Sequence, residues 1–149
     1  SKDEAFTATL AVGLDEVIEA VPQYQRKHGV DWVKAFAHYY LGKQHRSDLA
    51  CGCAMATLTP EVVRSGPKVQ AAFEKKMTLI VNLVANGLAG TSDEDCHTRA
   101  WALLGTLIGG LTVSRAMKSR VVADEVAQAI TDAASKTAGR AQVRMPDGP

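Results

Sequence analysis

The residues best suited to binding a metal ion lie near the middle of the chain. Cys51 and Cys53 flank a glycine, and His38 and His45 precede them. Thiolates and imidazoles are the usual zinc ligands, but structural sites space their cysteines by two to four residues around a turn. On a helix, side chains two residues apart point about 200° away from each other. We therefore interpret both cysteines as small buried thiols, and we expect no metal and no cofactor.

Motifs of nucleophilic, phosphate-binding and metal-dependent enzymes are missing. The sequence has no G-x-S-x-G elbow, no glycine-rich phosphate loop, no H-E-x-x-H and no paired Glu and His of the di-iron type. Its carboxylates gather at predicted helix starts, as at Asp3, Glu4 and Glu94, where they complement the helix dipole. We expect that the protein is not an enzyme.

Aromatic side chains make up only 5% of the residues, yet most of them lie on two predicted helices. A ligand pocket between helices combines an aromatic wall with a few hydroxyl or amide groups. Ordinary core packing is the alternative interpretation of each of these side chains. The candidate pocket residues are Trp32, Phe36, Tyr39, Tyr40, Phe73 and Met77.

The segment from Ser92 to Lys118 predicts a helix that is apolar almost all the way round. Such a helix must be buried on more than one face, either at the centre of a monomer or against a partner. Small residues on one face suit the close approach of a second backbone. We predict a homodimer interface formed by this helix and the last one. Its candidate residues are Ala102, Gly105, Thr106, Gly109, Val113, Val126, Ile130 and Ala133.

Six or seven helices are predicted to position these residues. A capping box at Ser1 to Glu4 opens a helix that runs to about residue 26, and Asp31 caps a second helix. Asp48 and then Thr59 are predicted to cap two short helices. Pro67 starts a long helix that ends at Gly87 or Gly90. A second capping box, Thr91 to Glu94, opens the apolar helix, and the final helix spans about 122–136.

No segment alternates apolar and polar residues with the period of a strand, so the predicted class is all-α. Residues 1–139 are expected to form one domain and residues 140–149 a flexible tail. Lys and Arg exceed Asp and Glu by 17 to 16, which gives a net charge of +1. We therefore expect no specific DNA binding by these residues. The three cysteines and the lack of a spanning apolar run favour a cytoplasmic protein that does not cross a membrane.

Three stretches of the sequence resemble the C-terminal domain of the TetR/AcrR family of bacterial transcriptional regulators. The first is SKDEAF at the start. The second runs from GCAMATL, at residues 52–58, to EVVRSGPKVQAAF, at residues 61–73. The third is LLGTLIGGL followed by SRA, within residues 103–116. Each motif is loose, and their order and spacing carry the resemblance.

The resemblance implies an effector-binding and dimerisation domain that acts on operator DNA through an upstream helix-turn-helix domain of about 45 residues, which is absent here. The regulator would be a repressor whose small, apolar or aromatic effector alters DNA binding. The implied pocket lies between four helices and adds Cys53, Met55 and Trp101 to the candidate residues. One alternative is a stand-alone helical bundle that binds a small apolar molecule or a partner helix. A third is a cofactor-dependent all-α enzyme.

Overall fold

The computed structural model describes residues 1–49 and 54–142. These residues form eight α-helices and one short 3-10 helix, with no strand among them, which confirms the all-α class. The helices are α1 (Lys2–His28), α2 (Trp32–Tyr40), α3 (Lys43–Ser47), α4 (Ala54–Thr57), α5 (Thr59–Arg64), α6 (Pro67–Asn86), α7 (Asp93–Ala116) and α8 (Arg120–Ala138), with η1 (Gly29–Asp31) between α1 and α2.

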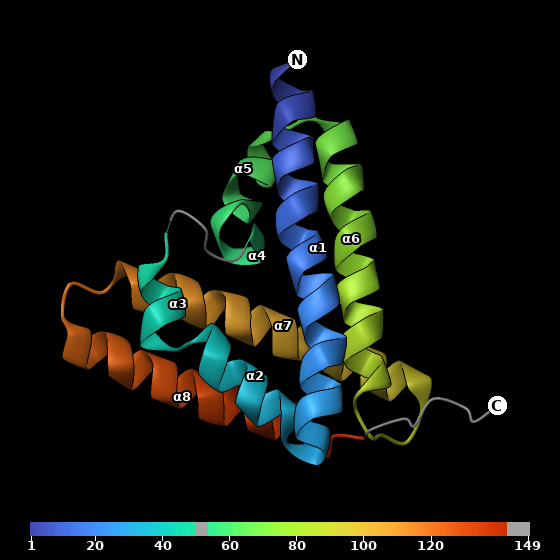
Figure 1. The fold of residues 1–149 in the computed structure, drawn as a ribbon, viewed down its shortest axis with the longest axis vertical. Helices are drawn as coiled ribbons and strands as arrows, with labels where there is room; N and C mark the ends of the chain where they lie inside the picture. Colours follow the sequence, from blue (N-terminus) through green and yellow to red (C-terminus); the bar gives the residue numbers. More distant parts are fainter. Residues whose placement is uncertain (50–53, 143–149) are drawn as a thin grey trace.

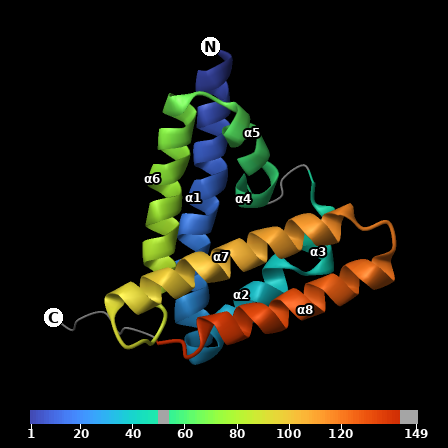
Figure 2. The ribbon, with the colours of Figure 1, turned by 180° about the vertical axis from the view of Figure 1, so that it is seen from behind.

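Two pairs of long helices define the shape (Figure 1). Helices α1 and α6 run in parallel, and they are joined by an ion pair from Lys76 to Asp15 at 2.5 Å and by a hydrogen bond from Gln25 to the Leu83 carbonyl at 2.9 Å. Helices α7 and α8 form an antiparallel pair that crosses the lower part of the first pair (Figures 1 and 2). Helix α2 packs against α1 on one side and α8 on the other.

Local signals explain where the long helices begin and end. The Ser1 hydroxyl accepts from the Glu4 amide while the Glu4 side chain reaches back, so the predicted capping box is confirmed. Pro67 occupies the first turn of α6, as predicted. Gly29 and Gly139 follow α1 and α8 with φ of 56° and 62°, a conformation that favours glycine.

Three predicted caps are wrong. Asp48 lies at the C-terminal end of α3 and does not open a helix described in the structure. The Thr59 hydroxyl donates to the carbonyl of Met55, so Thr59 lies inside a helical turn and Leu58 precedes α5. At α7 the cap is Ser92, one residue after Thr91, and its hydroxyl accepts from the Asp95 amide at 3.1 Å.

One core fills the space between the two helix pairs. Leu14, Trp32, Met55, Ile80 and Leu107 are all essentially inaccessible to solvent. Helices α7 and α8 approach closely because α7 carries glycine where α8 presents a bulky side chain. A Cβ atom built on Gly110 would lie only 2.4 Å from the Cγ2 of Ile130. Within the described residues, no helix is both long enough and apolar enough to span a bilayer.

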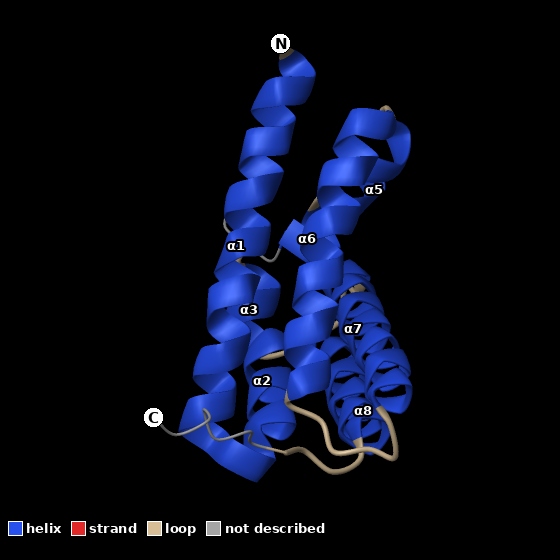
Figure 3. Cartoon of the chain, turned by 90° about the vertical axis from the view of Figure 1, so that its right-hand side faces the viewer, coloured by secondary structure: helices blue, strands red, loops and turns tan. Residues whose placement is uncertain are grey.

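The segment after α8 pairs with the segment after α6 (Figure 3). The Ala89 amide donates to the Arg140 carbonyl at 2.8 Å, and the Gln142 amide donates to the Gly87 carbonyl at 2.9 Å. Arg99 of α7 adds a clamp, because its guanidinium donates to the carbonyls of both Ala89 and Ala138. Residues 140–142 of the predicted tail therefore lie against the bundle, and residues 143–149 are outside the described part of the chain.

Candidate functional site

The aromatic residues of α2 form one continuous row. Trp32, Phe36 and Tyr40 follow one another at intervals of four, so their rings lie on the same face of the helix. The ring centroids are 6.5 Å apart between Trp32 and Phe36, and 5.8 Å apart between Phe36 and Tyr40. Tyr24 of α1 meets Phe36 edge to face at 5.4 Å. This geometry is typical of aromatic packing and holds α2 against α1.

Trp32 anchors one end of the row. Its indole is fully buried, and its Nε1 donates to the Gly87 carbonyl at 2.8 Å. Gly87 ends α6, and a Cβ atom there would lie 2.9 Å from the indole nitrogen. Glycine therefore leaves the space that the tryptophan occupies. Trp32 joins α2 to the end of α6 and does not line the small cavity described next.

A cavity of about 100 Å³ lies at the other end of the row, between α1, α2 and α3. Its lining residues are Gly13, Glu16, Val17, Ala20, Phe36, Tyr39, Tyr40, His45 and Asp48. Ligand pockets in proteins are commonly about 300–1,000 Å³ in volume. As it stands, this cavity suits a ligand no larger than a single small ring, and a larger effector requires the side chains around it to move.

His45 supplies the polar edge of this cavity. Its Nδ1 atom lies 2.5 Å from the Tyr40 carbonyl oxygen, and because a carbonyl only accepts, Nδ1 must carry the proton. Burial lowers the pKa of His45, and nearby Arg115 lowers it further, whereas the Tyr40 carbonyl and Asp48 act in the opposite direction. At neutral pH the ring is therefore neutral, and its Nε2 atom is a hydrogen-bond acceptor. Burial also raises the pKa of Tyr24, with a smaller contribution from Tyr39.

The lowered pKa of His45 predicts a loss of stability in mild acid. As the pH is lowered past the ordinary pKa of 6.5, the unfolded chain takes up a proton at this histidine while the folded chain does not. The free energy of unfolding therefore decreases as the pH falls, and it stops decreasing below the pKa of the folded state. His45→Asn keeps a donor towards the Tyr40 carbonyl and cannot titrate. We expect urea unfolding between about pH 7.5 and pH 5 to show a steeper loss for the wild type than for the variant.

The comparison with the variant isolates His45, because the other three histidines are present in both proteins. A stability difference between the two proteins that stays constant across this pH range would contradict the assignment of a neutral, half-buried imidazole.

The remaining predicted pocket residues are dispersed. Met55 and Met77 are buried in the core, on α4 and α6, and Phe73 of α6 is half-buried against it. Trp101 is 44% exposed on α7, where its indole nitrogen lies 3.3 Å from the Nε2 of His97. Cys53 lies outside the described residues, as does Cys51. Tyr39 lines the cavity but is 54% exposed.

Two residues that meet the aromatic row were missed from the sequence because they come from other helices. Tyr24 of α1 packs against Phe36 without lining the cavity, whereas His45 of α3 does line it. The spacing of Tyr24 from Val17 and Val21 does place it on the apolar stripe of α1. Nothing in the sequence around His45 marks it as buried.

The residues predicted to form a dimer interface lie partly on an open surface (Figure 2). Ala102, Gly105, Gly109 and Val113 of α7 are exposed, and Thr106 is half-buried. Cβ atoms built on Gly105 and Gly109 would meet no described atom within 4 Å outside the local turn of the helix. The α8 residues Val126, Ile130 and Ala133 are partly buried, and Ile130 packs against Gly110 within the same chain.

No metal centre is found in the part of the chain that the structure describes, where no group of three or more His, Cys, Asp or Glu side chains could hold an ion. The thiol of Cys96, in α7, donates to the Leu88 carbonyl at 3.5 Å.

Comparison with protein families, with curated proteins and with solved structures finds no match to this chain. The resemblance to the TetR/AcrR family therefore stays a prediction from the sequence motifs.

Proposed function

We propose that this chain is the effector-binding and dimerisation domain of a TetR-like transcriptional repressor, which acts on DNA through a helix-turn-helix domain outside this sequence. Support comes from the three sequence motifs and from the order of the helices. A long first helix, a bent central segment and two long antiparallel C-terminal helices follow one another as the resemblance implies.

The observation that carries the proposal is the outer face of α7. An interior helical glycine is less favourable than alanine by about 1 kcal/mol. Gly105 and Gly109 lie one turn apart on this face, and among the described residues no atom outside their own helical turns would lie within 4 Å of a Cβ atom at either position. A partner helix packed at close range would explain both glycines. Val113 follows Gly109 by one more turn of α7 and is an apolar side chain that is 47% exposed.

A two-fold axis through this face would pack α7 and α8 against their copies in a four-helix interface. The start of α1 lies at the opposite end of the molecule from the α7–α8 pair (Figure 1). Because the aromatic cavity lies between α1 and α2, a bound effector would bias the position of α1 relative to the dimer. Such a bias requires the effector to bind one arrangement of the two helices more tightly than the other.

Sedimentation of residues 1–149 at micromolar concentration tests the dimer, and a monomeric chain would overturn this half of the proposal. Codons upstream of Ser1 that encode a three-helix segment of about 45 residues with basic flanks would support the regulator. A reading frame that starts at or near Ser1 would favour the stand-alone bundle.

Phenol, a single ring with one hydroxyl, is a suitable probe of the aromatic cavity. An apolar cavity of about 150 Å³ can hold benzene, so a ring of this size requires only small adjustments here. We expect saturable chemical-shift changes in the amide NMR signals of Gly13 and Ala20, which line the cavity. Ala20→Leu fills the space with its own side chain and is expected to abolish these changes while the chain stays folded. Equal shifts in the filled variant would contradict the cavity as a ligand site.

A further inference from the structure

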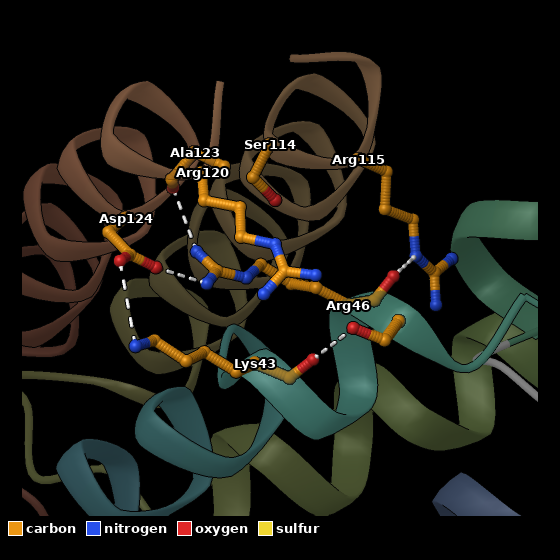
Figure 4. Close-up of a pocket in the computed structure, with 8 residues that line it drawn as sticks. Lys43, Arg46, Ser114, Arg115, Arg120, Ala123 and Asp124 are labelled. Atoms are coloured by element: carbon orange, nitrogen blue, oxygen red, sulfur yellow. Dashed lines mark hydrogen bonds and ion pairs between the residues drawn. The ribbon is translucent and has the colours of Figure 1, made fainter. Parts of the chain in front are cut away.

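A second cavity, of about 260 Å³, lies between α3, the end of α7 and the start of α8 (Figure 4). Four cationic side chains and one carboxylate line it. The lining residues are Lys43, Arg46, Ser47, Ser114, Arg115, Arg120, Ala123 and Asp124. This concentration of positive charge contrasts with the net charge of only +1 for the whole chain.

Two of the four cations are held rigidly by the protein. Arg46 has a side chain only 10% exposed, donates to the Ala123 carbonyl at 2.8 Å and forms an ion pair with Asp124. Arg115 donates to the carbonyl of Arg46 at 3.2 Å and to that of His45 at 2.9 Å. These contacts fix two guanidinium groups at the wall of the cavity.

The other two cations are not fixed in this way. The Lys43 ammonium lies 3.7 Å from Asp124 and is 82% exposed. Arg120 extends into the same space (Figure 4), and within the described residues its guanidinium has no hydrogen bond or ion pair. Asp124 is the only carboxylate among the described lining residues, and it already faces both Arg46 and Lys43. The cavity therefore holds positive charge that the protein itself does not neutralise.

We propose that this cavity binds a small phosphate-bearing anion, inorganic phosphate or a small phosphomonoester, with Arg120 and Lys43 closing on it. A phosphate group carries about −1.5 to −2 charges at neutral pH and matches the fork of a guanidinium group. The start of α8 adds the positive end of a helix dipole, and no acidic residue occupies its first turn. The volume leaves room for a short organic group beside the phosphate.

The site is independent of the proposed dimer and regulator. The lining residues come from α3, the end of α7 and the start of α8, and none of them is among the residues proposed for the dimer interface. The charge is confined to one corner and does not form a stripe along a helix, which favours a small anion over a nucleic acid.

Calorimetric titration of the whole chain with inorganic phosphate, at an ionic strength held constant with sodium chloride, tests the proposal. We expect saturable binding of one phosphate per chain. Arg120→Gln is expected to raise the dissociation constant about tenfold or more, because it removes a charge-assisted contact. The Arg120 side chain forms no hydrogen bond or ion pair within the described residues, so the variant is expected to unfold at the same temperature as the wild type. Arg26→Gln, on the exposed surface of α1, is the matched control and is expected to bind phosphate normally.

Two further arms complete the experiment. Lys43→Gln is also expected to weaken phosphate binding. This second variant tests the site even if Arg120→Gln perturbs the fold. Binding of glycerol 3-phosphate, a small soluble phosphomonoester, is compared with binding to vesicles that contain phosphatidic acid, which carries the same phosphate on a lipid. Absence of saturable phosphate binding, or equal losses in the Arg120 and Arg26 variants, would overturn the proposal. Vesicle binding that depends on Arg120 would assign a lipid head group and overturn the small soluble ligand.

Discussion

Gly109→Trp is expected to convert the chain from a dimer into a folded monomer. Among the described residues of the single chain, no atom outside the local turn of α7 lies within 4 Å of the Cβ position, so an indole there is expected to project into solvent without disturbing the bundle. In the proposed dimer the same indole enters the helix contact twice, once from each chain. Overpacking costs about 1–3 kcal/mol per site, so the dissociation constant of the dimer is expected to rise by roughly 30-fold or more.

Sedimentation velocity over a range of micromolar concentrations measures this change, and circular dichroism checks that the variant remains helical. Lys75→Trp places the same side chain on the exposed surface of α6, away from the α7–α8 face, and is expected to remain dimeric. A Gly109→Trp dimer as tight as the wild type would mean that the chains associate through another surface.

The long helices were predictable because several independent signals coincide in each. In α1, for example, the capping box and the buried residues Leu10, Leu14, Val17 and Val21 indicate the same helix and the same face. Fewer signals coincide in the short segments, where the caps Asp48 and Thr59 were predicted wrongly, and the cap of the long helix α7 was misplaced by one residue. Thr91 and Ser92 are both good capping residues, and local chemistry alone does not decide between them. Tertiary packing decides, because it sets where the chain can turn into α7.

Less of the candidate sites than of the helices could be predicted from the sequence. A spacing of four residues was enough to predict that Trp32, Phe36 and Tyr40 share a face. The rotation of α7 was harder to predict, because a helix that is apolar all round has no single inward direction. Trp101, which the family resemblance places in a pocket, is 44% exposed, whereas Leu104, one turn further along α7, is buried. The basic cavity was not predictable at all, since it forms from residues in α3, α7 and α8 that are far apart in the sequence.

Trp32→Ala is expected to cause the largest loss of stability among the aromatic residues of α2. The substitution leaves a cavity between α2 and the end of α6, and it removes the only donor that the indole offers to the Gly87 carbonyl. Truncating a buried tryptophan or phenylalanine to alanine costs about 3–5 kcal/mol. Small domains have a total stability of only about 5–15 kcal/mol, so the variant is expected to be partly unfolded at moderate temperature.

Two further variants, Trp32→Phe and Trp101→Phe, make the same substitution at a buried and at an exposed tryptophan. Trp32→Phe keeps most of the ring but loses the donor, and a buried acceptor left without its partner costs about 1–3 kcal/mol. Trp101→Phe changes an exposed side chain, so a shift of no more than about 0.5 kcal/mol is expected. All variants are compared by urea unfolding at one protein concentration, because dimer stability depends on concentration. If Trp32→Ala cost less than about 1 kcal/mol, the Trp32 site would tolerate an empty space, as a ligand pocket does, and the structural role given to this indole would be wrong.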